Sequence, residues 1–289
     1  MSWRVGAVGV TALMAAGLLS GCSAVGILNA LTPKHSYQLS KGIAYGSDAR
    51  QRVDVYRPTP LATGLPLVVF FYGGSWNRGS RNDYVFLGEA LASRGVVAVL
   101  ADYRLYPQVR YPAFLEDSAA AVAWAVRAAP DYGADSSKIY VMGHSAGAYN
   151  AAMIALDARW LTAEGLSPDS LAGWIGLAGP FDFLPIVNPE VRPVFNYPDS
   201  PADSQPIAHV SALAPRTFLG AANKDALVDP RRNSQQMADK LRAAGVDVTL
   251  KFYPWASHVT LASAFARPLR RIASVLDDVD AFMHAHTAR

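Results

Sequence analysis

The sequence predicts an α/β protein with one mostly parallel central sheet that helices cover on both faces. Three observations favour this class. Short apolar runs rich in β-branched and aromatic residues recur along the chain, stretches with helical spacing separate them, and 51% of the 289 residues are hydrophobic against 17% charged. This composition excludes a disordered chain. Alternating strands and helices are typical of βαβ units, which build parallel sheets.

Six runs have the nearly continuous apolar pattern of strands that are buried on both faces. In chain order they are residues 66–72, 96–101, 138–142, 174–178, 217–221 and 248–253. Two weaker runs precede them, at residues 42–45 and 52–56. We expect these two to add an antiparallel edge to the sheet.

Helices are predicted where apolar residues recur with helical spacing, over residues 114–129, 146–156 and 234–244. The first stops before Pro130 and the last at Gly245, which are usual helix stops.

Residues 180–215 break this alternation, because they are rich in Pro, Asp and Ser with scattered aromatic residues. We expect this segment to run above the sheet as a short irregular cap that walls a substrate pocket. The chain shows no internal repeat, and we assign residues 41–289 to one catalytic domain.

The N-terminus has the features of an export signal. A short basic start precedes an apolar run that is shorter than the roughly 20 residues of a spanning helix. Residues 19–22, Leu-Ser-Gly-Cys, resemble a bacterial lipobox, in which cleavage precedes the cysteine and its thiol is acylated. We expect a signal peptide over residues 1–21, a lipid on Cys22 and a tether over residues 22–40. A plain secretory peptide or an uncleaved anchor is the alternative.

Charge and cysteine content exclude other classes. The formal net charge of +3 gives no basic footprint for nucleic acid, so we expect no such partner. A single cysteine excludes an intrachain disulfide and any zinc site built on several thiolates. The oligomeric state stays open.

The motif Gly-His-Ser-Ala-Gly occupies residues 143–147, between a predicted strand and a predicted helix. This context is that of a nucleophile elbow, which holds the hydroxyl of Ser145 out of a strained turn. Both glycines are needed because a Cβ there would clash with the neighbouring strand and helix. Adjacent residues of an elbow point apart, so we assign His144 to packing beside the pocket and not to base catalysis.

A glycine-rich turn follows the strand at residues 66–72, at Gly73 and Gly74. In this architecture such a turn supplies backbone N–H groups that bind the oxyanion of a tetrahedral intermediate.

From about residue 50 onward, the chain resembles α/β-hydrolases of the carboxylesterase type, close to the hormone-sensitive-lipase and isoprenylcysteine-methylesterase branches. The motifs that carry the resemblance are the elbow, Tyr72-Gly73-Gly74-Ser75-Trp76, Ala101-Asp102-Tyr103-Arg104-Leu105 with Tyr106-Pro107, and residues 111–117.

The turn departs from the family pattern, because Tyr72 replaces a histidine and Ser75 replaces a third glycine. Backbone donors survive such changes. The resemblance places the oxyanion donors at the N–H groups of Gly74, Ser75 and Ala146. We expect Tyr72 to alter the shape of the pocket, and with it the choice of substrate.

The base must follow Ser145, in the chain order Ser, Asp, His. The histidines are His35, His144, His209, His258, His284 and His286. His258 lies just after the last predicted strand, where the family carries its catalytic histidine. The others precede the nucleophile or lie in the irregular cap or the terminal helix.

The family pattern for the acid, Gly-x-x-x-Asp-x-x-Val-Pro, places it at Asp225. Asp229 is the near rival because an extra residue precedes Pro230, and Asp182 is a more distant one.

The resemblance implies a carboxylesterase with a Ser145–His258–Asp225 triad, an acyl-enzyme intermediate, and no metal or organic cofactor. The alternatives are an arylformamidase-like amide hydrolase, because such relatives share the Gly-Gly-X-Trp turn, and a catalytically silent binding module. The lipid anchor implies a bacterial cell envelope protein held on a membrane at its periplasmic face.

Four aromatic residues lie on loops that this topology places near the mouth of the pocket. They are Trp76, Phe181, Phe183 and Trp255. Each could equally belong to the core.

Overall fold

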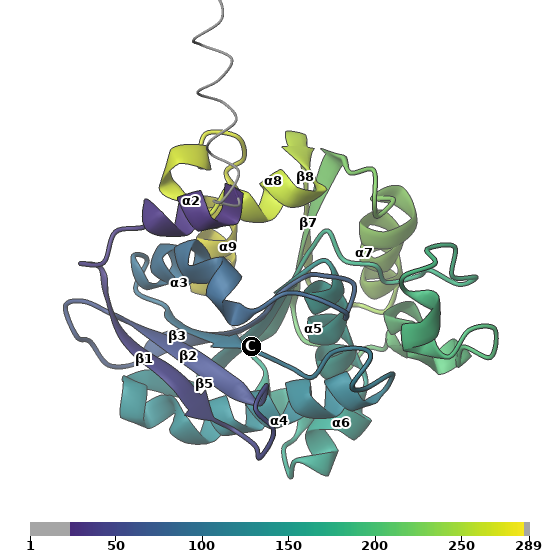
Figure 1. Ribbon diagram of the computed structural model, residues 1–289, viewed down its shortest axis with the longest axis horizontal. Helices are drawn as coiled ribbons and strands as arrows, with labels where there is room; N and C mark the ends of the chain where they lie inside the picture. The colour runs from purple at the N-terminus through teal and green to yellow at the C-terminus, as the bar shows by residue number, and fades with distance from the viewer. Residues whose placement is uncertain (1–23, 286–289) are drawn as a thin grey trace, which may run out of the picture.

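The computed structural model describes residues 24–285 of the chain. These residues form an eight-stranded sheet with the order β1-β2-β4-β3-β5-β6-β7-β8 (Figure 1). Its strands are β1 (Tyr37–Ala44), β2 (Arg52–Pro58), β3 (Leu65–Phe71), β4 (Val97–Ala101), β5 (Ala134–His144), β6 (Gly173–Leu177), β7 (Thr217–Lys224) and β8 (Val248–Ser257). β1 pairs antiparallel with β2, and β2 with β4, while all the other pairs are parallel.

The burial of the strands explains their sequence patterns. Every residue of β4 and of β6 is buried, whereas no residue of the edge strand β1 is. Strands covered on both faces need apolar residues throughout, which is why their runs stood out in the sequence. The predicted α/β fold with an antiparallel edge is therefore confirmed.

Helices cover both faces of the sheet (Figure 1). α3 and α9 contact each other on one face, and α4 and α5 contact each other on the opposite face. The helices are α2 (Ala24–Ala30), α3 (Val85–Ala92), α4 (Ala113–Ala128), α5 (Ala146–Leu156), α6 (Ala158–Ala163), α7 (Gln236–Ala243), α8 (His258–Ser263) and α9 (Val275–His284). No helix among residues 24–285 is long and apolar enough to cross a bilayer.

Short turns of helix join these elements. The 3₁₀ turns are η1 (Arg81–Tyr84), η2 (Ala129–Tyr132), η3 (Pro168–Ser170), η4 (Arg192–Phe195), η5 (Ala202–Ser204), η6 (Pro206–His209) and η8 (Arg267–Leu269), and η7 (Arg231–Gln235) is π-helical. Residues 180–215 contain only η4, η5 and η6 as regular structure, so the expected irregular excursion is present.

The folded part of the chain begins earlier than the sequence predicted. The expected tether over residues 22–40 is wrong for residues 37–40, which already belong to β1. Asn29 of α2 also bonds to the backbone of Asn82 and Phe86, so α2 is docked on the domain. The predicted signal peptide and Cys22 lie outside the described residues.

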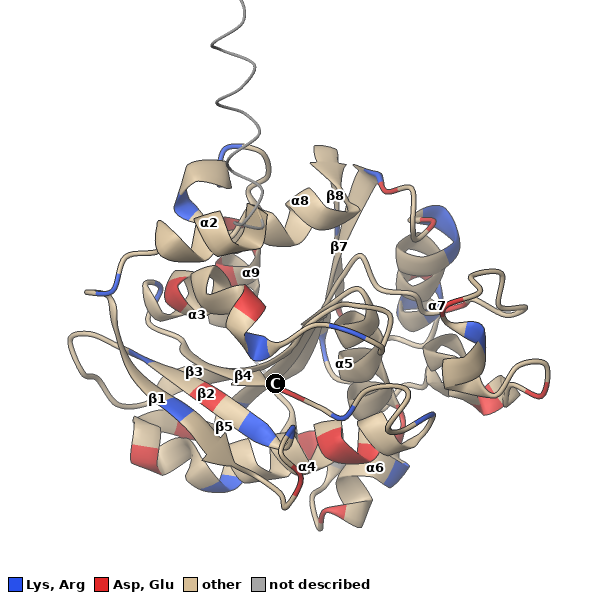
Figure 2. Ribbon diagram, in the orientation of Figure 1, with Lys and Arg blue, Asp and Glu red and all other residues tan. Residues whose placement is uncertain are grey.

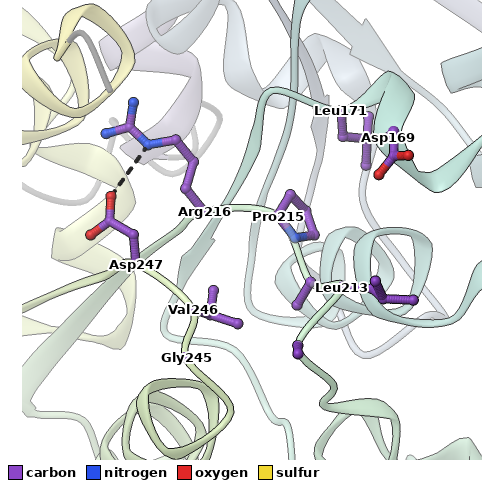
Figure 3. Close-up of a pocket in the computed structure, with 10 residues that line it drawn as sticks. Asp169, Leu171, Leu213, Pro215, Arg216, Gly245, Val246 and Asp247 are labelled. Atoms are coloured by element: carbon purple, nitrogen blue, oxygen red, sulfur yellow. Dashed lines mark ion pairs between the residues drawn. The ribbon is translucent and has the colours of Figure 1, made fainter. Parts of the chain in front are cut away.

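Charged residues are spread over the outer helices and loops, whereas α2 and α8 carry none (Figure 2). At the amino ends of β7 and β8 lies a hollow of about 350 Å³ in which Arg216 and Asp247 form an ion pair with Nε and Oδ2 3.8 Å apart (Figure 3). The nucleophile elbow follows the carboxyl end of β5, at the opposite edge of the sheet.

Candidate active site

Ser145 occupies the strained turn that the sequence predicted. It lies between β5 and α5 with φ 55° and ψ −122°, a backbone conformation that residues other than glycine rarely adopt. A Cβ on Gly143 would lie 2.0 Å from the carbonyl oxygen of Gly147, and a Cβ on Gly147 would lie 1.9 Å from that of Phe71. Both glycines are therefore required for the close approach of β5, α5 and β3.

Ser145, His258 and Asp225 lie in one line of hydrogen bonds. The Nε2 atom of His258 is 2.8 Å from the Ser145 Oγ, and its Nδ1 is 2.8 Å from the Asp225 Oδ2. A carboxylate only accepts hydrogen bonds, so the proton resides on Nδ1 and Nε2 accepts from the serine hydroxyl. This is the arrangement in which an imidazole can remove the hydroxyl proton.

The start of α8 fixes the position of His258, which is the first residue of that helix. Ser257 caps the helix, and its side chain and that of Thr260 bond reciprocally to each other's backbone N–H groups. This capping box satisfies donors that the helix itself leaves free. The His258 side chain is only 9% exposed, so its ring has little freedom to leave the serine.

Asp225 lies just after β7 and its side chain is 2% exposed. The Oδ1 atom accepts from the backbone N–H groups of Leu227 and Val228, each at 2.9 Å, which leaves Oδ2 for His258. Burial alone would raise the pKa of Asp225, but the hydrogen bonds from His258 and the two N–H groups outweigh it and hold the pKa below its usual value. The carboxylate is thus ionised and oriented.

The two rival carboxylates are engaged elsewhere. Asp229 accepts from the N–H groups of Arg231 at 2.8 Å and Arg232 at 3.1 Å, at the start of η7. Asp182 forms an ion pair with Arg232 at 3.2 Å. The structure therefore brings Asp225, and neither rival, to His258.

His144 bonds to the backbone that carries His258. Its Nε2 donates to the carbonyl oxygen of His258 at 2.8 Å, and its Nδ1 accepts from the Tyr84 hydroxyl at 3.1 Å. Burial first, and the nearby His258 second, lower the pKa of His144 to about 3. His144 therefore stays neutral and supports the backbone of His258, and Tyr84 is a supporting residue that the sequence did not reveal.

The remaining described histidines lie apart from this line. His209 donates from Nε2 to the carbonyl oxygen of Asp203, His284 pairs with Asp280, and His35 is exposed. His286 lies outside the described residues.

The glycine-rich turn presents free backbone donors next to Ser145. Gly74 has φ 131° and Ser75 has φ 52°, so the turn runs through the left-handed region. A Cβ on Gly73 would lie 2.9 Å from the Ser145 Cβ, which shows how closely the turn approaches the nucleophile. The N–H groups of Gly74, Ser75 and Ala146 donate no hydrogen bond to any other residue among residues 24–285.

Tyr72 does not line the pockets beside Ser145, so the expectation that it shapes them is wrong. Its ring is buried and stacks on Tyr103 with centroids 4.7 Å apart, and its hydroxyl accepts from Arg50 at 2.7 Å. Tyr72 packs behind the turn, where a Cβ on Gly79 would meet its ring at 2.7 Å. It supports the turn without lining either pocket.

Two pockets flank the serine hydroxyl, and both Ser145 and His258 line each of them. The larger, of about 550 Å³, is walled by residues of the segment 180–191, as expected for the irregular excursion. The smaller, of about 350 Å³, lies between the glycine-rich turn, α8 and Val25 of α2.

The four aromatic residues expected near the mouth divide into two groups. Trp76 and Phe183 line the larger pocket and stack on each other with ring centroids 6.1 Å apart. Phe181 instead packs against Trp174 in the core. Trp255 is 73% exposed and lies under the Lys224 ammonium, away from both pockets.

The fold and this constellation define an α/β-hydrolase of the carboxylesterase branch. Comparison with known proteins gives the particular family. The BD-FAE family model matches residues 53–241, and the chain belongs to this family.

Several known proteins are similar to the chain. A probable isoprenylcysteine alpha-carbonyl methylesterase of Oryza sativa subsp. japonica is 30% identical over 248 residues, which cover 78% of this chain and 58% of that protein. The kynurenine formamidase of Salmo salar is 28% identical over 229 residues, covering 76% and 74%. A solved hyperthermophilic esterase from Pyrobaculum calidifontis superposes with a TM-score of 0.72 at 25% identity, over 90% of this chain and 87% of that one. The chain spans less than two thirds of the length of the methylesterases it matches.

Proposed function

We propose that the protein is a serine carboxylesterase in which Ser145 is the nucleophile, His258 the general base and Asp225 the acid that orients it. One observation carries this proposal: at the junction of two pockets, the Ser145 hydroxyl donates to His258 Nε2 at 2.8 Å, and His258 Nδ1 donates to Asp225 at 2.8 Å. The esterase names among its relatives support the same reaction class.

The reaction begins when the Ser145 Oγ attacks the ester carbonyl and His258 Nε2 takes its proton. Asp225 stabilises the imidazolium that forms. The imidazolium then protonates the leaving alkoxide, and an acyl-enzyme remains on Ser145. Water, deprotonated by the same Nε2, attacks the acyl carbon and restores the serine. The imidazolium then returns its proton to the departing Ser145 Oγ, and the carboxylic acid leaves.

The N–H groups of Gly74, Ser75 and Ala146 hold the negative oxygen of the tetrahedral intermediate. They have no acceptor among the described residues, so they are available for this oxygen. Ala146 also opens α5, whose N-terminal end attracts negative charge. One such donor typically contributes about 2.7–4 kcal/mol to the transition state.

The larger pocket favours an uncharged ester with an apolar group. Its apolar lining consists of Trp76, Ala146, Pro180, Phe183, Ile186, Val187, Pro189, Val191, Leu227 and Val228. Arg78 and Glu190 also line it, but they pair with each other at 2.9 Å and largely neutralise each other. Removing a hydrocarbon group from water into such a pocket contributes about 0.8 kcal/mol per methylene.

Amide hydrolysis is the second candidate, because the similarity to a kynurenine formamidase covers three quarters of both chains. The same three side chains can cleave an N-formyl arylamine if His258 protonates the leaving amine. Specificity constants for an N-formyl arylamine and for p-nitrophenyl esters of graded acyl length separate the two reactions. A higher constant for the amide would replace the esterase proposal.

A fluorophosphonate probe tests whether the site is catalytic. We expect one probe per chain, attached to Ser145 and identified by peptide mass spectrometry, with loss of ester hydrolysis in proportion to labelling. Labelling without any hydrolysis of the esters or the amide would contradict the proposed activity. No labelling at Ser145 would indicate a silent binding module.

We also propose that Cys22 carries a lipid that holds the protein on a bacterial membrane at its periplasmic face. The Leu-Ser-Gly-Cys segment supports this, and Cys22 is the only cysteine of the chain. Mass spectrometry should find a diacylglyceryl thioether on an N-terminal Cys22. The variant Cys22→Ser should keep the mass of the uncleaved precursor. If the unaltered protein also had this precursor mass, the result would contradict acylation.

A further inference from the structure

The helix α2 has its polar side chains turned toward the protein. The side-chain amide of Asn29 donates to the carbonyl oxygen of Asn82 at 2.8 Å and accepts from the N–H of Phe86 at 3.3 Å. Thr32 follows the helix, is 8% exposed, and donates to the carbonyl oxygen of Leu28 at 2.9 Å. These are the two hydrogen-bonding side chains of residues 24–32.

The outward side of the same helix is wholly apolar. Ile27 is 48% exposed and Leu31, whose N–H bonds to the Ile27 carbonyl oxygen, is 62% exposed. Ala24 and Ala30 are exposed beside them and complete the face. A surface helix of a water-soluble domain normally shows the reverse polarity. We call Ala24, Ile27, Ala30 and Leu31 the outer face of α2.

This apolar surface continues toward the smaller pocket. Val25, on the inner side of α2, lines that pocket together with Val259 of α8 and Leu227. Val259 is 60% exposed and Leu227 is 75% exposed. Figure 2 shows α2 and α8 next to each other at the top of the molecule, without a charged residue on either. These three apolar side chains therefore border a pocket that reaches Ser145, which Arg78 and Asp83 also line.

Chain connectivity identifies what covers the outer face. Cys22 lies two residues before Ala24, and two residues span at most about 7 Å. Acyl chains on Cys22 would thus enter the bilayer within one helix diameter of α2. A lipid surface must then lie against or very near this helix, and the outer face has the composition that such a surface accepts.

We propose that the outer face of α2 rests on the bilayer that holds the lipid anchor, so that the smaller pocket opens at the lipid surface and receives esters that partition into it. This inference rests on the proposed acylation of Cys22 and on the proposed esterase activity. It assigns the partner of the site as a membrane interface and its substrate class as amphiphilic esters.

Spin labels test the docking without using activity. When Cys22 is acylated, a cysteine introduced by Ile27→Cys is the only free thiol and takes a nitroxide label specifically. The control is Leu213→Cys, which is 83% exposed and lies at the far hollow of Figure 3. The acylated proteins, which begin at Cys22, are inserted into phosphatidylcholine vesicles, and relaxation by oxygen is compared with relaxation by a water-soluble nickel chelate.

We expect the label at position 27 to favour oxygen and the label at position 213 to favour nickel, because oxygen concentrates in lipid and the chelate does not enter it. Equal nickel accessibility at both positions would overturn the proposal. Spin–spin broadening at position 27 that persists in detergent would also overturn it, because a second copy of the chain would then cover the face.

Activity on two kinds of substrate tests the consequence. We compare Ile27→Glu/Leu31→Glu with the control Leu61→Glu/Leu213→Glu, whose side chains are also exposed. We expect the α2 variant to lose about tenfold in hydrolysis of a long-chain ester held in vesicles, with hydrolysis of p-nitrophenyl acetate unchanged. Equal rates for both variants on the vesicle ester would contradict the proposal. If the unaltered protein does not hydrolyse p-nitrophenyl acetate, the result would instead contradict the proposed esterase activity.

Discussion

Two buried carboxylates near the carboxyl ends of the strands, Asp225 and Asp117, have different partners. Asp117 of α4 is 1% exposed and accepts from the Arg104 guanidinium at 2.7 Å, from the Arg104 N–H at 2.8 Å and from Gln51 at 2.8 Å. Asp225 is 2% exposed and bonds to the imidazole of His258. A permanent cation saturates the first carboxylate, while the partner of the second can gain a proton.

Their surroundings differ in the same way. His258 and Ser145 line both pockets, whereas Asp117, Arg104 and Gln51 line neither. Burial and hydrogen bonding alone therefore do not distinguish a carboxylate that serves chemistry from one that holds loops together. The distinguishing features are a partner that also bonds to a serine hydroxyl and access to a pocket, and the following experiments test that distinction.

Removing the proposed nucleophile should have the largest effect. For Ser145→Ala we expect kcat to fall by about 10⁴-fold or more, because the covalent intermediate cannot form. The free energy of unfolding, measured by urea denaturation, should change little, since the hydroxyl makes one hydrogen bond, to His258. Turnover within tenfold of the unaltered enzyme would remove Ser145 from the mechanism.

Replacing the proposed orienting acid should lower kcat nearly as much. In Asp225→Asn the amide can donate to Nδ1, which favours the wrong tautomer of His258, and a loss of about 10⁴-fold in kcat is typical of this change. Asp229→Asn is the matched control, because Asp229 is four residues away and bonds only to the start of η7. A larger loss in Asp229→Asn would transfer the role to that residue.

Removing Asp117 should affect stability instead of catalysis. Asp117→Ala leaves the partly buried Arg104 with only the exposed Glu116, 4.0 Å away, and breaking a buried pair typically costs about 3–5 kcal/mol of unfolding free energy. We expect kcat per folded molecule to stay within a few fold. Asp117→Asn keeps the shape, should lose less stability, and serves if the alanine variant does not fold. A loss of kcat comparable to that of Asp225→Asn would erase the difference between the two clusters.

These clusters also explain what the sequence could predict of the site. Ser145 has a local signature, because the elbow needs glycines at 143 and 147. His258 is 113 positions from Ser145 and 33 from Asp225, so only chain order and the family resemblance could select them. Nothing in the sequence indicated Tyr84, since its bond to His144 joins positions 60 apart and follows no spacing rule.

The fold was predictable where one face or both faces of an element are apolar in a regular pattern. β4 and β6 are wholly buried and read as strands. α3 was not predicted, because all of its residues after the first are buried and no helical period remains. The sequence places α2 in a tether, because the apolar side of this helix faces outward and its polar residue, Asn29, faces the domain.

His144 gives the smallest expected effect and lies inside the catalytic cluster while serving as a support. Its pKa of about 3 in the folded state lies below the value of about 6.5 in an unfolded chain. As the pH falls below about 6.5, the unfolded chain therefore binds a proton that the folded protein does not. The contribution of neutral His144 to the free energy of unfolding is therefore fully present above about pH 6.5. About 2 kcal/mol of this free energy should be lost by about pH 5.

The variant His144→Gln isolates this contribution, because glutamine keeps hydrogen-bonding capacity and does not titrate. The free energy of unfolding is measured by urea denaturation from about pH 6.5 down to about pH 5. As the pH falls, that of the unaltered protein should decrease by up to about 1.4 kcal/mol per pH unit more than that of the variant. Near neutral pH, the variant should keep most of its kcat, because His144 contacts the backbone of His258 and not the reacting atoms. Parallel stability curves would contradict the buried, neutral state of His144. A loss of kcat as large as that of Asp225→Asn would instead show that His144 takes part in the proton transfer itself.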